Sequence, residues 1–135
     1  MTSDEFGLDD IGQIHISVGD VARAVAFYRD VLGMQLLFEV PDQPMAFFMC
    51  GSVRIYLGKP ETDAFRSNPV LYYRVADIER AVETLRGRGV EFEADAHVVH
   101  RDANHELWMA GFRDPDGNYI NLMSEVPRAE SRSGA

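Results

Sequence analysis

The chain has 135 residues, of which 46% are apolar and 26% charged, which predicts one soluble globular domain with a single core. Its formal net charge of −9 argues against nucleic acid and membranes as partners, because an acidic surface repels phosphate groups and anionic lipid. With one cysteine, Cys50, no intrachain disulfide can form, so we expect a reducing, cytoplasmic location.

The first element expected along the chain is a strand over residues 11–18. Its apolar side chains alternate with polar ones, as in a half-buried strand: Ile14, Ile16 and Val18 against Gln13, His15 and Ser17. Asp20 then stands where a helix N-cap belongs, since its carboxylate can accept from the first free N–H groups. Apolar residues at helical spacing predict a helix that ends at Gly33.

Three more strands are expected before a polar connection. They cover 34–40, 44–50 and 53–58, with turns marked by proline, aspartate and glycine. Cys50 follows the apolar run AFFM and is expected to be an inert buried thiol. The polar segment 59–69, which holds two prolines, is the expected linker.

The second half of the chain repeats the first. ISVGDVARAV at 16–25 recurs as YRVADIERAV at 73–82, again as an alternating strand, a capping aspartate (Asp77) and a helix. Strands over 90–101, 105–112 and 118–125 are expected to follow, with turns at DAN and DPDG.

The order βαβββ therefore occurs twice, which predicts an α+β fold. We expect one domain over 1–135: module one at 10–58, the linker at 59–69, module two at 70–126 and a polar tail at 127–135. Each helix covers one face of its sheet. The two sheets are expected to curl into an eight-stranded mixed sheet around a concave pocket.

The other face of the sheets is unusually polar and aromatic. The side chains expected there, as candidates for binding a small molecule, are Gln13, Arg54, Tyr56, Tyr72, Met109, Asn121 and Met123, together with His15. A simple solvated sheet is the alternative, although the large apolar bodies of Tyr56, Tyr72 and Met123 are costly to leave open.

Three of the four histidines lie in HVVHRDANHE, residues 97–106. The DAN turn predicts a hairpin that brings His100 and His105 near each other. Strand alternation places His97 on the opposite face, so the three are not expected to ligate one ion. Trp108 is expected in the core. Two interpretations of His100 and His105 remain. Either they line a pocket rim together with His15, or the hairpin is simply polar and solvated.

The motifs IGQIHISVGDVARAVAFYRDVLGM and GFRDPDGNYINLM resemble the vicinal oxygen chelate superfamily, also called the glyoxalase/bleomycin-resistance/dioxygenase superfamily. The resemblance covers about residues 10–126. It implies paired βαβββ modules, a small-molecule pocket and, in many members, a homodimer. It also implies one divalent metal ion, such as zinc, iron, manganese or nickel, that acts as a Lewis acid.

In such relatives the metal ligands come from the first and last strand of each module. The resemblance places them here at Gln13, Tyr56, Val70 and Asn121, a set without carboxylate or imidazole. Such a set binds a transition metal poorly. His15, two residues after Gln13 and on the same face, is a candidate replacement ligand, so Gln13 and His15 are the weak metal candidates, and the sequence leaves open whether any cofactor binds.

Two functions follow. One is an enzyme of the glyoxalase or dioxygenase type, a lyase, isomerase or dioxygenase that acts on a small oxygen-rich substrate. His15 would serve as base or ligand, with His100 or His105 assisting as catalytic residues. The alternative is a binding or sequestering protein of the bleomycin-resistance type, which needs no metal.

Overall fold

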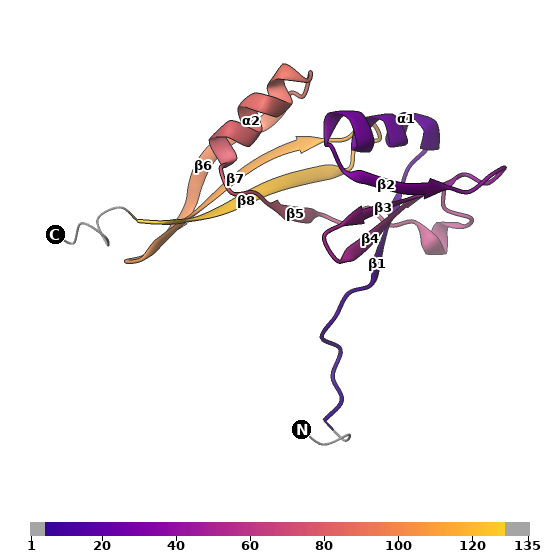
Figure 1. The fold of residues 1–135 in the computed structure, drawn as a ribbon, viewed down its shortest axis with the longest axis horizontal. Helices are drawn as coiled ribbons and strands as arrows, with labels where there is room; N and C mark the ends of the chain where they lie inside the picture. The colour runs from indigo at the N-terminus through magenta and orange to yellow at the C-terminus, as the bar shows by residue number, and fades with distance from the viewer. Residues whose placement is uncertain (1–4, 129–135) are drawn as a thin grey trace.

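The computed structural model describes residues 5–128 and contains two βαβββ modules, as the repeat predicts. Each module forms its own four-stranded mixed sheet. Figure 1 shows the sheets side by side, with both helices above them and the segment before the first strand leaving below. The predicted α+β fold of two tandem βαβββ modules is confirmed, with the eight strands divided between two sheets. Of the predicted tail at 127–135, the residues after Arg128 lie outside the described part of the chain.

Module one holds sheet A, in the strand order β1-β4-β3-β2. Its elements are β1 (Gln13–Ser17), α1 (Val21–Ala26), a π-helical turn η1 (Phe27–Val31), β2 (Gln35–Glu39), β3 (Met45–Cys50) and β4 (Val53–Gly58). β1 runs parallel to β4, and the other neighbours are antiparallel.

Module two holds sheet B, in the matching order β5-β8-β7-β6. After a short 3-10 turn in the linker, η2 (Asp63–Phe65), come β5 (Leu71–Arg74), α2 (Ile78–Gly87), β6 (Phe92–Arg101), β7 (His105–Arg113) and β8 (Tyr119–Pro127). β5 is parallel to β8, so both modules share one topology.

Both helices begin as the sequence predicts. The carboxylates of Asp20 and Asp77 each accept from the backbone N–H three residues later, at 3.1 Å. The first helix closes before Gly33, whose φ of 73° favours glycine. No helix within residues 5–128 is long and apolar enough to cross a bilayer.

The core lies between the helices and the sheets and is shared by both modules. Alternation along the strands buries the predicted apolar set, including Ile16, Ile55 and Ile120. Phe27 of module one lies 6.4 Å from Phe112 of module two, measured between ring centroids. The two modules are therefore packed together through their helix side.

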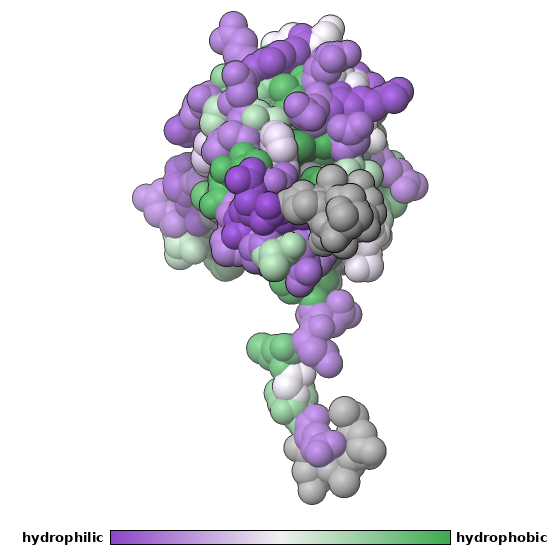
Figure 2. Space-filling model, turned by 90° about the vertical axis from the view of Figure 1, so that its left-hand side faces the viewer, coloured by the Kyte–Doolittle hydropathy of each residue, from purple (hydrophilic) through white to green (hydrophobic). Residues whose placement is uncertain are grey.

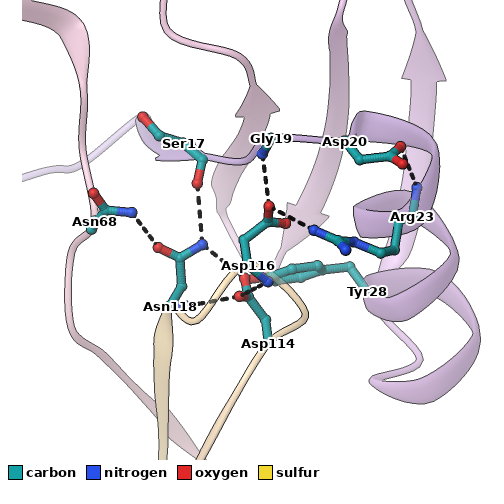
Figure 3. Close-up of polar contacts among 9 residues, drawn as sticks. All are labelled: Ser17, Gly19, Asp20, Arg23, Tyr28, Asn68, Asp114, Asp116 and Asn118. Carbon is teal, nitrogen blue, oxygen red and sulfur yellow. Dashed lines mark hydrogen bonds and ion pairs between the residues drawn. The ribbon is translucent and has the colours of Figure 1, made fainter. Parts of the chain in front are cut away.

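The turn between β7 and β8, DPDGN, fastens module two to module one (Figure 3). Asp116 accepts from Gly19 N at 2.7 Å and pairs with Arg23 at 3.1 Å. Asn118 Nδ2 donates to the carbonyl of Ser17 at 3.1 Å. This turn therefore fixes the end of β1 and the start of α1.

Candidate functional site

Each sheet has one face turned away from its helix, called here its open face. Directly paired residues point to the same side of a sheet. The register confirms the predicted phase, pairing Gln13 with Arg54, His15 with Tyr56, Tyr72 with Asn121 and Arg74 with Met123. The predicted binding residues therefore lie on the open faces.

An aromatic row crosses all four strands of the open face of sheet A. Phe38 stacks on Phe47 at 4.9 Å between ring centroids, Phe47 stacks on Tyr56 at 5.0 Å, and Tyr56 lies 4.4 Å from the ring of His15. Gly58 makes room for the row, because a Cβ there would lie 2.6 Å from the Tyr56 ring. These four side chains are named the aromatic row below.

Phe38 and Phe47 were not among the predicted site residues. Leu36 pairs with Phe48 but Phe38 pairs with Phe47, so Leu37 is the extra residue of a β-bulge. The bulge turns Phe38 onto the open face, where it is 51% exposed. The sequence did contain a signal for Phe47. The two adjacent phenylalanines of PMAFFMC must face opposite sides of a strand, so one of them must lie on the open face.

A polar pair lies beside the aromatic row. Arg54 donates from Nε to Gln13 Oε1 at 2.7 Å across β4 and β1. The same guanidinium lies 5.7 Å from the ring centroid of Phe47, within the range of a cation–π contact. The open face of sheet A thus presents aromatic rings beside one fixed positive charge.

His15 occupies the inner end of the row. Its Nε2 shares a hydrogen bond of 3.1 Å with Ser17 Oγ, whereas its buried Nδ1 has no hydrogen-bond partner among the described residues. Burial lowers the pKa of His15, and the nearby backbone of Tyr56 opposes this effect in part. Burial therefore favours the neutral form of the imidazole.

On the open face of sheet B, the amide of Asn121 is buried, with 7% of the residue exposed. Its Nδ2 has no partner in the described part of the chain. Neighbouring Gly111 lies under the Tyr119 ring, where a Cβ would come within 2.5 Å of the hydroxyl. Tyr72, paired with Asn121, is 53% exposed.

The prediction that His97 faces away from His100 is wrong. His97 pairs with Met109 and His100 pairs with Leu107, and both partners lie on one face because they are two residues apart on β7. A bulge between Val98 and His100 adds the residue that shifts the phase. All three hairpin histidines therefore lie on the open face of sheet B.

His100 and His105 nevertheless do not share a site with His15. They line a shallow depression at the end of sheet B with Asp102 and Glu125, and His15 is not among its lining residues. His100 Nε2 lies 3.9 Å from Asp102 Oδ2. The surface at this end of the molecule is largely hydrophilic (Figure 2).

A larger cavity lies on the other side of the molecule. It is an apolar groove of about 680 Å³ between α2 and the end of η1, lined by residues such as Leu32, Cys50, Tyr73, Ala81 and Leu85. Arg88 Nη1 donates to the carbonyl of Val31 at 2.8 Å and links the two walls. None of the predicted site residues lines this groove, called the helix-side groove below.

Residues 10–122 match the family model of the Glyoxalase/Bleomycin resistance protein/Dioxygenase superfamily. The chain belongs to this superfamily. A relative from Bacillus subtilis (strain 168), the uncharacterized protein YraH, is 29% identical over 126 residues, covering 82% of this chain and 94% of its own.

Solved structures of the superfamily share the fold. Lactoylglutathione lyase from Agrobacterium tumefaciens has a TM-score of 0.70 and 23% identity, with 87% of this chain and 95% of that chain covered. TnmS3, an antibiotic binding protein from Streptomyces sp. CB03234, has a TM-score of 0.71 and 21% identity, with 92% and 100% covered. At these identities the likeness concerns the fold alone.

The side chains at the metal positions that the resemblance implies do not fit a divalent ion. Gln13 Oε1 already accepts from Arg54, whose positive charge repels a cation at that point. Val70 has no donor atom, and Tyr56 is stacked in the aromatic row. Within residues 5–128, no three or more His, Cys, Asp or Glu side chains are grouped to hold a metal.

Proposed function

We propose that this chain binds a small planar molecule on the open face of sheet A, as a binding or sequestering protein. The observation that carries the proposal is the aromatic row, in which four rings are aligned across four strands. Solvent-exposed aromatic bodies are costly unless they meet a ligand or a partner. Rings of this kind contribute both apolar area and a geometric preference for other π systems.

Polar groups beside the row support a specific orientation for the ligand. Arg54 and Gln13 form a hydrogen-bonded pair beside the rings, and the guanidinium of Arg54 is exposed there. Few polar groups within an apolar surface are the usual composition of a small-molecule site.

A second candidate function is proton transfer by His15. Burial lowers the pKa of His15, which favours the neutral imidazole that a general base requires. A small oxygen-rich carbonyl compound is the expected substrate class. The test is deuterium exchange at the α-carbons of dihydroxyacetone in D2O, followed by NMR. Exchange above the buffer rate that is lost in His15→Gln supports catalysis, and exchange at the buffer rate contradicts it.

The binding proposal is tested with a neutral fluorescent naphthalene, N-phenyl-1-naphthylamine. We expect saturable binding to the wild type and a loss of affinity of about tenfold in Phe47→Leu, because one ring of the row is removed. Phe65→Leu is the matched control, since Phe65 is 65% exposed in the linker turn and outside the row. Equal affinities in the two variants would exclude the aromatic row as the site.

The helix-side groove is the rival apolar site, and Cys50 reports on it. Cys50 is the only cysteine of the chain and lines that groove. A dye seated in the groove slows the alkylation of Cys50, whereas a dye on the open face of sheet A leaves the rate unchanged. The homodimer implied by the resemblance stays a prediction, which sedimentation velocity measures.

A further inference from the structure

Arg54 lies where the polar pair and the aromatic row meet. Its Nε is used by Gln13, and its carbon Cζ stands 5.7 Å from the centre of the Phe47 ring. These two contacts hold the guanidinium beside the aromatic row. Arg54 itself is exposed, so its outer side faces the open side of the sheet.

The two Nη groups remain available to a ligand. A guanidinium has five N–H donors, and one of them is used at Gln13. No hydrogen bond or ion pair joins the Nη groups to other side chains within residues 5–128. A guanidinium that lies against an aromatic ring is weakly hydrated and presents its remaining donors in the geometry of a carboxylate or sulfonate.

We propose that the open face of sheet A selects planar molecules that carry an anionic oxygen group, and that Arg54 determines this preference. The inference rests on the proposed function, because the planar body is held by the aromatic row. Rings that stack across strands stand up from the sheet and turn their edges outward. Ring edges carry partial positive charge, which also favours an electron-rich ligand.

Local charge supports this selectivity in spite of the acidic chain. Two rows of paired residues cross the open face, and together they contain one cation and no carboxylate. These rows are Gln13–Arg54–Met49 and His15–Tyr56–Phe47–Phe38. In metal-dependent relatives, as the resemblance implies, the Gln13 position contributes to binding a divalent cation. Here the positive charge next to Gln13 belongs to the Arg54 side chain and not to a bound cation.

Two dyes that differ by one sulfonate test the preference. 8-Anilinonaphthalene-1-sulfonate (ANS) is N-phenyl-1-naphthylamine with an anionic group added. We expect the wild type to bind ANS more tightly than the neutral dye. In Arg54→Gln, ANS affinity should fall by at least about tenfold more than the affinity for the neutral dye, as expected for the loss of a charge-assisted hydrogen bond.

Arg29→Gln is the control for the change in net charge. Arg29 is paired with Asp30 on the surface of η1 and is not part of the open face. ANS affinity should be unchanged in this variant. The wild-type preference for ANS should also shrink as salt is added, because salt screens an exposed charge.

Gln13→Glu gives a second, nearly isosteric test. A carboxylate at position 13 would neutralise the guanidinium without removing it, so the preference for ANS over the neutral dye should shrink. Neutral-dye binding without any preference for ANS, or a preference that survives Arg54→Gln, would overturn the inference and leave the proposed function intact. Failure of both dyes to bind overturns the proposed function as well.

Discussion

Tyr28 of module one donates its hydroxyl hydrogen to Asp114 Oδ2 of module two at 2.8 Å, and both residues are buried. Burial is the main cause that raises the pKa of Tyr28 far above its ordinary value, and the Asp114 carboxylate adds to it. Tyr28 therefore remains a donor over the whole physiological range. The bond joins the first helical segment to the last turn and holds the modules together.

Removal of the Tyr28 hydroxyl should destabilise the whole chain. Tyr28→Phe deletes a hydrogen bond to a buried carboxylate, so we expect the free energy of unfolding to fall by about 1–3 kcal/mol. Urea unfolding measures this loss. Tyr72→Phe is the matched control, because Tyr72 is exposed on sheet B and should change the stability by less than about 0.5 kcal/mol. Equal losses in the two variants would contradict the role of Tyr28.

Cys50 should be a slow thiol. Burial raises its pKa above the ordinary value of 9.0, which lowers the fraction of reactive thiolate at pH 8. Alkylation by iodoacetamide should therefore be slower in the folded chain than in urea, and its rate should rise with a midpoint above pH 9.0. A midpoint at or below that of the unfolded chain would show that the thiol is not held in the apolar groove.

His15 should make stability depend on pH in a defined window. Its pKa is lowered in the folded chain, so below pH 6.5 the unfolded chain binds more protons at this position. The contribution of His15 to stability is therefore present above pH 6.5 and is lost as the pH falls through the lower folded value. The difference in unfolding free energy between wild type and His15→Gln should therefore change as the pH falls below 6.5, with the wild type losing stability relative to the variant. A constant difference would contradict this sign.

Sequence patterns correctly predicted the features that depend on residues close together in the chain. Strand alternation and the capping residues Asp20 and Asp77 set the two βαβββ modules, and the structure shows both caps. The turn at DPDGN was also predicted. Its partners in module one, such as Gly19 and Tyr28, were not, because contacts between residues about 90 positions apart leave no periodic signal.

The candidate site was predicted in part, and bulges account for the rest. Gln13, His15, Arg54 and Tyr56 lie on regular strands, so their shared face followed from alternation. One extra residue in β2 turned Phe38 to the open face, and one in β6 put His97 beside His100. A bulge changes the phase of a strand without changing its composition, so alternation alone misplaces every residue beyond it.

A crystal structure of the chain with bound ANS tests the proposed site most directly. We predict density for the naphthalene against Phe47 and Tyr56 on the open face of sheet A, with the sulfonate within hydrogen-bond distance of the Nη groups of Arg54. ANS seated in the helix-side groove beside Cys50, with the aromatic row free, would contradict both the site and the role of Arg54.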